Sequence, residues 1–229
     1  RWATHTSGAY LEFQTTSSFI EIKVDLTHGS YLPHMSAIAQ AGFCLYYFDD
    51  GRWIFLASSK VDQKNYIYRM IESLSNTLKT FRLFFPLYVG VEDIEVGIES
   101  TSILEKQQQS CKNKVICYGT SITQGACASR AGMSYTNIVS RKIEEQVYNF
   151  GFSGSANLEI EMAKIIANIE NMSHLVIEVS ANAGQTSYLF ERFDNFINEI
   201  IAKYPDLPIL LISPFPNPLH KLFTKIKET

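Results

Sequence analysis

The sequence predicts two folds in one chain: an N-terminal all-β sandwich, jelly-roll-like, followed by a three-layer α/β domain with a parallel sheet. In the first hundred residues, apolar and polar positions often alternate with a period of two, which is typical of half-buried strands. In the second half, short apolar runs alternate with helical stripes, as in a parallel sheet covered on both faces. The polar, aperiodic stretch between them predicts a sandwich domain at 1–104, a linker at 105–113 and an α/β domain at 114–229.

The first half contains a series of strand candidates. In residues 20–26, isoleucine, valine and leucine alternate with charged residues, which predicts a strand that is buried on one face. Residues 43–48 and 53–57 flank the pair Asp50-Gly51, and Asp-Gly favours a tight hairpin turn. The apolar, aromatic stretches 65–71, 81–88 and 94–98 are further strand candidates. Several short strands separated by turn residues predict a β-sandwich.

The second half alternates between strand and helix candidates. Near-continuous apolar runs predict buried strands at 115–118, 147–150, 175–179 and 209–212. Apolar residues at helical spacing predict helices around 134–146, 158–169 and 189–200. In a sheet of this kind, ligands bind beyond the carboxyl ends of the strands.

Composition and charge exclude several classes of partner. The 229 residues are 46% hydrophobic and 19% charged, as in ordinary globular proteins. A net charge of −3 provides no basic footprint, so we expect no nucleic-acid partner. No apolar run approaches the roughly 18 residues needed to span a bilayer, so we expect no membrane partner. The chain starts without methionine or a signal-like segment, and we expect a secreted or periplasmic protein whose leader is not in this sequence.

The four cysteines fit no Cys-x-x-Cys or zinc spacing, so we expect no metal and no cofactor. Cys117 falls inside an apolar strand and is expected to be a small buried hydrophobe, whereas Cys127 lies in a loop close to solvent. The sequence leaves open both whether any of the four cysteines, Cys44 and Cys111 included, form a disulfide and what the oligomeric state is.

Three residues follow successive predicted strands at the same pole of the sheet: Ser121, Gly154 and Asn182. A serine hydroxyl attacks an ester carbonyl once a base removes its proton. The backbone N–H groups of Ser121 and Gly154 and the side-chain amide of Asn182 are suited to stabilising the resulting oxyanion. Taken singly, they are more typical of a helix cap, a turn glycine and a loop asparagine. Their joint position favours an acyl-transfer site.

Around these residues the sequence resembles the SGNH/GDSL hydrolases, in the branch that carries an N-terminal β-sandwich. Residues 118–125 (Tyr-Gly-Thr-Ser-Ile-Thr-Gln-Gly), with 127–133, resemble that branch's nucleophile block. Residues 149–155 resemble its glycine block and 176–182 its asparagine block. The sandwich motifs of the branch are resembled by 33–35, 42–46 and 86–92. The resemblance implies a flavodoxin-like hydrolase domain acting on a small acyl ester, such as an acylated carbohydrate.

The sequence departs from this family at two places. The sandwich motif normally reads Gly-x-Asp-Leu-Tyr, and Cys44 stands at the aspartate. The Asp-x-x-His block that the family carries near the end of the hydrolase domain is absent, so we expect this domain to be incomplete at the C-terminus and a poor esterase as given. His220 follows the fourth strand and is the candidate base, or else a surface histidine; His174 precedes the third strand, at the wrong pole. Arg130 is expected either to bind a substrate oxygen or to be a solvated loop charge.

We therefore expect a serine esterase that hydrolyses an acyl ester, in particular an acetyl ester, of a carbohydrate or similar small substrate. An acyltransferase using the same Ser121 is the first alternative, because water and an alcohol compete for one acyl-enzyme. The second alternative is a non-catalytic carbohydrate-binding protein with a degenerate hydrolase domain.

Overall fold

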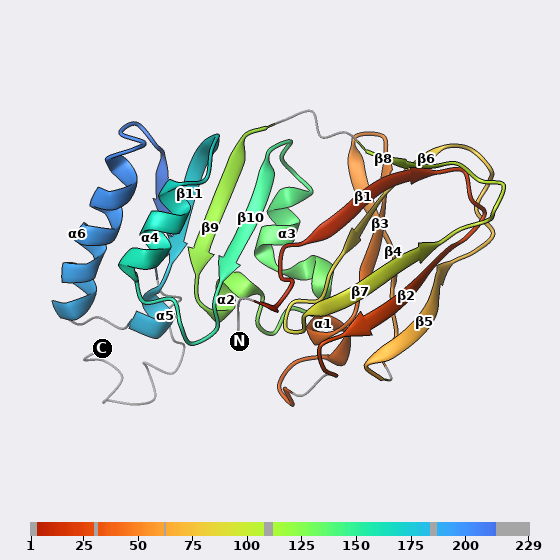
Figure 1. Ribbon diagram of the computed structural model, residues 1–229, viewed down its shortest axis with the longest axis horizontal. Helices are drawn as coiled ribbons and strands as arrows, with labels where there is room; N and C mark the ends of the chain where they lie inside the picture. The colour runs from red at the N-terminus through yellow and green to blue at the C-terminus, as the bar shows by residue number, and fades with distance from the viewer. Residues whose placement is uncertain (1–3, 30–31, 62, 108–111, 184–186, 214–229) are drawn as a thin grey trace, which may run out of the picture.

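The computed structural model describes residues 4–29, 32–61, 63–107, 112–183 and 187–213. Cys111 and His220 lie outside these residues. Figure 1 shows a β-rich half beside an α/β half. This is the predicted fold class: antiparallel sheets followed by a parallel four-stranded sheet with helices.

The sandwich strands are β1 (Tyr10–Thr15), β2 (Ile20–Leu26), β3 (Cys44–Asp49), β4 (Arg52–Ser58), β5 (Asn65–Ile71), β6 (Lys79–Phe84), β7 (Val91–Gly97) and β8 (Leu104–Lys106). One sheet has the order β4-β3-β6-β1-β8 and the other the order β5-β2-β7, and all pairs are antiparallel. Between the sheets lies a core that includes Phe43, Phe81 and the four apolar residues of β2. The alternation predicted for β2 is therefore confirmed.

The predicted hairpin joins β3 and β4. Asp50 has φ 45° and Gly51 has φ 75°, and positive φ at both central residues is the geometry of a type I′ turn. The prediction was less accurate elsewhere. β6 ends at Phe84 rather than continuing to residue 88, because Pro86 has no N–H to donate to a ladder.

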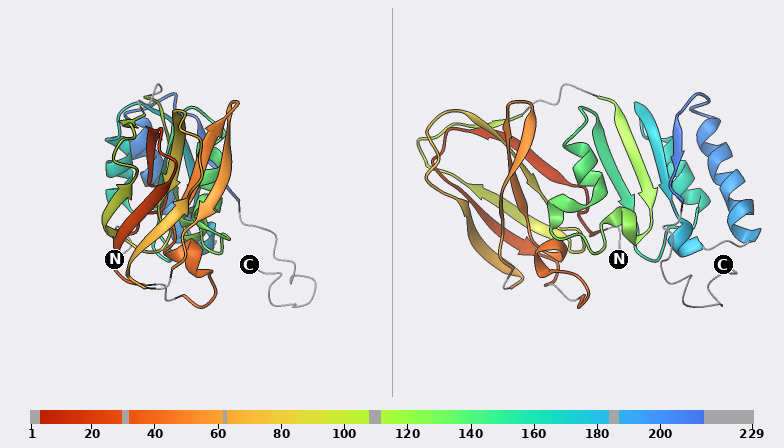
Figure 2. Two further views of the ribbon diagram at one scale, coloured as in Figure 1. Left: turned by 90° about the vertical axis from the view of Figure 1, so that its right-hand side faces the viewer. Right: turned by 180° about the vertical axis from the view of Figure 1, so that it is seen from behind.

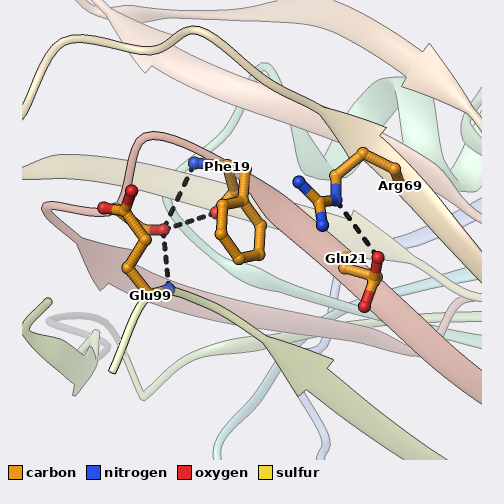
Figure 3. A network of polar contacts seen from close by, with 5 residues as sticks. Phe19, Glu21, Arg69 and Glu99 are labelled. Carbon is orange, nitrogen blue, oxygen red and sulfur yellow. Dashed lines mark hydrogen bonds and ion pairs between the residues drawn. The ribbon is translucent and has the colours of Figure 1, made fainter. Parts of the chain in front are cut away.

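Figure 3 shows a polar cluster at one end of the sandwich. The Glu99 carboxylate accepts hydrogen bonds from the Ser18 hydroxyl at 2.6 Å and the Ser18 N–H at 3.2 Å, which lowers the pKa of Glu99. The Arg69 guanidinium lies 3.8 Å from the centre of the Phe19 ring, and its Nε donates to Glu21 at 3.1 Å. These contacts fasten the turn before β2 to β5 and to the end of β7.

The α/β half contains β9 (Lys114–Gly119), β10 (Gln146–Gly151), β11 (Met172–Glu178) and β12 (Ile209–Leu211), in the order β10-β9-β11-β12. Its longer helices are α3 (Tyr135–Ser140), α4 (Ile160–Ala167) and α6 (Ser187–Ile201). α4 and α6 pack on one face of the sheet and α3 on the other, so the three layers are as predicted (Figure 1). α3 is shorter than the predicted 134–146, since Glu144 and Glu145 would lie at the negative end of a longer helix.

Short helical turns complete the fold: α1 (Ala37–Gln40), α2 (Ser121–Gln124), the 3₁₀ turn η2 (Ala131–Met133) and α5 (Ser180–Ala183). In Figure 2, α2 and α5 lie at the same end of the parallel sheet. None of the helices in the described residues is long and apolar enough to cross a membrane.

The five-stranded sheet of the sandwich turns an aromatic face toward the α/β half. Arg82 of β6 lies 4.3 Å from the centre of the Trp53 ring, and its Nη1 donates to the Ser140 carbonyl of α3 at 2.8 Å. From the other side, the Arg141 guanidinium lies 4.2 Å from the centre of the Tyr46 ring. The two halves are thus joined by arginines that stack on aromatic rings, a contact that favours a fixed relative position.

Candidate active site

Ser121 lies where the central strand of the parallel sheet ends. β9 finishes at Gly119, and Thr120 is the N-cap of α2, with its Oγ1 accepting the Ile122 N–H at 3.2 Å. Ser121 is the first residue of the helix and is half-buried. The hydroxyl that caps the helix is therefore that of Thr120, and the Ser121 hydroxyl is not used as a cap.

Two glycines allow α2 to sit directly on the strand ends. A Cβ atom at Gly119 would lie 2.1 Å from the Thr123 Oγ1, and one at Gly151 would lie 2.1 Å from the Gln124 backbone nitrogen. No side chain fits at either place. The absence of both side chains determines how close Ser121 lies to the sheet edge.

The structure brings Gly154 and Asn182 together. Gly154 has φ +72° in the loop after β10, and Asn182 lies in α5, directly after β11. With its oxygen turned toward that loop, the Asn182 carboxamide accepts the Gly154 N–H at 3.2 Å and the Ser155 N–H at 3.1 Å. In this arrangement the Gly154 N–H is already engaged, and the NH₂ group of Asn182 is the donor that remains for a ligand.

A buried carboxylate lies next to the turn that carries Ser121. Glu178 ends β11 and is 2% exposed. Its Oε2 accepts hydrogen bonds from the Thr120 hydroxyl at 2.7 Å, the Thr120 N–H at 3.2 Å and the Thr123 hydroxyl at 3.2 Å. The Thr123 oxygen also lies 3.0 Å from the Tyr135 hydroxyl, whose pKa is raised by burial. The sequence analysis missed this role, although a charged residue at the end of an apolar strand was a usable signal.

Gln124 joins three separate segments. Its side chain is 1% exposed, and Nε2 donates to the Leu87 carbonyl at 3.1 Å and lies 2.9 Å from the His5 Nδ1. Its Oε1 accepts the Ser153 N–H of the glycine-block loop at 2.9 Å. The Gln124 amide therefore joins α2 to the sandwich and to the loop that carries Gly154.

The other candidate residues lie as follows. Arg130 is half-buried, with its guanidinium 4.0 Å from the centre of the Phe55 ring, so it packs on the sandwich rather than being a solvated loop charge. His174 lies within β11 rather than before it, and its Nδ1 is 3.9 Å from Glu145 at the opposite end of the sheet.

Cys117 is buried and Cys127 exposed, as expected. In the described part of the chain no group of three or more His, Cys, Asp or Glu side chains could hold a metal ion.

Comparison with protein families gave two matches. The model of the GDSL-like lipase/acylhydrolase family matches residues 112–228. A model described as the N-terminus of SGNH-hydrolase-type esterases, and named for its GxDLY motif, matches residues 1–104. A search of curated proteins found no match.

Solved structures show the same fold. A structure described as a GDSL-like lipase from Bacteroides ovatus has 28% identity and a TM-score of 0.92, covering 98% of this chain and 66% of its own. The salicylyl-acyltransferase SsfX3 from a tetracycline biosynthetic pathway has 21% identity and a TM-score of 0.70, covering 90% of this chain and 59% of its own. A family two carbohydrate esterase from Clostridium thermocellum, in complex with cellohexaose, has 15% identity and a TM-score of 0.62, covering 97% of this chain and 77% of its own.

The first two of these structures are longer than this chain, which spans 66% and 59% of their lengths. The family assignment does not depend on them, because the first family model alone covers just over half of the 229 residues. The turn that carries Ser121, the parallel sheet and strands β1 to β7 of the sandwich lie within matched regions. The protein belongs to the GDSL-like lipase/acylhydrolase family.

Proposed function

We propose that the protein is a serine esterase in which Ser121 is the nucleophile. The observation that carries the proposal is the position of Ser121 at the carboxyl end of β9, in a turn whose cap is supplied by Thr120. The helix start places backbone N–H groups beside the serine, which suits them to an oxyanion. The buried carboxylate of Glu178 holds this turn in place by accepting hydrogen bonds from Thr120, and these bonds do not involve Ser121.

In the proposed mechanism, the Ser121 oxygen attacks the ester carbonyl while a base takes its proton. The Ser121 N–H and the Asn182 NH₂ group stabilise the oxyanion, and the Gly154 N–H joins them when Asn182 releases it. His220 is the candidate base within this sequence. We expect a low kcat/KM for the 229-residue chain, since the family's Asp-x-x-His block is not in it.

For the substrate, we propose an acetyl or similar small acyl ester of a carbohydrate. The support is the shared fold with the carbohydrate esterase from Clostridium thermocellum, which was solved with cellohexaose. The salicylyl-acyltransferase has the same fold, so transfer to an alcohol is the second candidate. The two reactions share the acyl-enzyme and differ in the group that attacks it.

Hydrolysis of p-nitrophenyl acetate by a protein extended through the family's Asp-x-x-His block, and by its Ser121→Ala variant, tests the nucleophile. We expect kcat to fall by about a thousandfold or more, because the other groups of the site contribute little without it. Ser129→Ala, an exposed serine in the same region, is the matched control and should keep its activity. A fluorophosphonate probe should label Ser121 in the extended protein, which contains the base. Equal turnover of the two variants, or no labelling, would refute the assignment.

A competition experiment separates the two reactions. The extended protein is given p-nitrophenyl acetate with increasing concentrations of xylose, and acetate and acetyl-xylose are quantified. An esterase releases acetate at all concentrations, whereas an acyltransferase converts most of the acyl group to acetyl-xylose. Absence of both products from a folded protein would favour the non-catalytic binding protein.

A further inference from the structure

Cys44 occupies a position that is surrounded by hydrogen-bond donors. It is the first residue of β3 and fully buried, and its Sγ lies 3.2 Å from the Ser58 hydroxyl oxygen of β4. The backbone N–H groups of Ala131 and Gly132 and the charge of Arg130 also act on the thiol, and each favours its ionised form. Burial outweighs them, so the pKa of the thiol is raised.

Two buried polar atoms in the same cluster lack a well-formed hydrogen bond. Within the described residues, the Arg130 Nε and the Tyr46 hydroxyl are both buried without a partner of ordinary geometry, although the Arg130 side chain lies close enough to the Tyr46 oxygen to favour its ionised form. Tyr46 is 3% exposed and lies against Arg130 and Cys44. Leaving such groups unsatisfied is costly, and natural structures rarely do so. The neutral Cys44 thiol is thus surrounded by hydrogen-bond donors from Ser58 and the backbone of residues 131–132 and by the charge of Arg130.

The same cluster carries an excess of positive charge. Arg130 and Arg141 both approach Tyr46. Burial lowers the pKa of Arg141, and the positive charges of Arg82 and Arg130 lower it further. The matching family model is named for a motif with aspartate at this position, where this chain has Cys44. A carboxylate here would accept hydrogen bonds from Arg130 and from the two N–H groups, and would offset the charge.

We propose that position 44 is a positioning residue that anchors the loop after Ser121, at 125–134, to the sandwich. In this chain the Cys44 thiol fits the space, but it is neutral and therefore gives Arg130 and the two N–H groups no charged acceptor. Arg130 is consequently held by stacking on Phe55, and the loop is less firmly fixed than an acidic residue would make it. The inference concerns the domain contact and does not depend on the proposed esterase activity.

The test restores the acceptor. Cys44→Asp is compared with Cys44→Asn, which has the same shape without the charge, and both are combined with Arg130→Met. Unfolding is followed by far-UV circular dichroism, and amide hydrogen exchange is measured over residues 125–134. We expect Cys44→Asp to raise Tm by about 4 °C or more and to slow exchange of the Ala131 and Gly132 amides several-fold.

The controls decide the interpretation. Cys44→Asn should give no increase in Tm, and Cys44→Asp should lower Tm in the Arg130→Met background, where its charge lacks a partner. The slower exchange should also disappear in that background, which a general packing effect would not cause. The proposal is overturned if Cys44→Asp fails to fold while Cys44→Asn folds. It is equally overturned if the two single variants have the same Tm, or if the gain survives Arg130→Met.

Discussion

At the scale of single residues, two adjacent hydroxyl groups at the start of α2 have different partners. Thr120 caps the helix and donates to the buried Glu178, whereas Ser121 occupies the first helical position. Because Thr120 makes the contacts that fix this turn, the turn can be rigid while the Ser121 hydroxyl is not used in holding it together.

Thr120→Ala should lower the free energy of unfolding by about 2 kcal/mol, because it removes both the cap and a hydrogen bond to a buried carboxylate. Thr120→Ser keeps the hydroxyl and should stay within about 0.5 kcal/mol of the parent. Urea denaturation measures both values. Similar losses in the two variants would show that the methyl group, and not the hydroxyl, stabilises the turn.

The described cysteines should differ sharply in reactivity. Burial raises the pKa of Cys117 to about 12 and also raises that of Cys44, so both thiols stay protonated at pH 8 and should resist iodoacetamide. Cys127 is exposed and should react first among these three. Peptide mass spectrometry after partial alkylation gives the order. Rapid labelling of Cys117 in the folded protein would contradict its burial.

The raised pKa of Cys117 also has a consequence for alkaline stability. The unfolded thiol ionises near pH 8.5 to 9, while the folded thiol ionises only near pH 12. Its contribution is therefore fully present below pH 8 and is lost as pH rises between these values. Cys117→Ala should flatten this part of the pH dependence of Tm, relative to its own value at pH 7.

At the scale of elements, the glycine that ends β10 and the glycine in the loop after it have different reasons to be glycine. Gly151→Ala would drive a Cβ into the backbone of α2 and should cost about 3 kcal/mol. Gly154 faces open space, so Gly154→Ala meets only the cost of its positive φ, about 1 kcal/mol. Thermal unfolding of the pair separates close packing from backbone conformation. Equal losses would show that α2 moves away from the sheet without penalty.

The accuracy of the sequence analysis differed between elements for physical reasons. The β3–β4 hairpin and β5 were predicted well, because turn chemistry and alternation are local signals. β8 was missed: its three residues are exposed and form a strand only by pairing with β1. Ser121, Gly154 and Asn182 could be placed at one pole because parallel strands end at the same edge. Glu178 and Gln124 act through contacts between segments far apart in sequence, which no local pattern contains.

At the scale of the whole molecule, the two halves share a buried contact, so they should unfold together. In a Trp2→Phe background, Trp53 fluorescence reports on the sandwich, and far-UV circular dichroism at 222 nm reports mainly on the helices of the α/β half. We expect the two probes to give coincident urea transitions in the parent protein. Arg141→Met removes the stacking on Tyr46 and the hydrogen bond to Gly132, and should separate the transitions. Separate transitions in the parent would mean that the halves are energetically independent.

The side chain of Gln124 offers a spectroscopic view of the assembled site. Its NH₂ protons lie between the Leu87 carbonyl and the His5 ring in a buried environment, so they should resonate away from the crowded region of exposed glutamine amides. Because the same amide holds the loop that carries Gly154, its signal in an ¹⁵N-labelled sample would report docking of the sandwich and closure of that loop together. A single pair of NMR peaks would then show, in solution and without substrate, what fraction of molecules has the site in its folded arrangement.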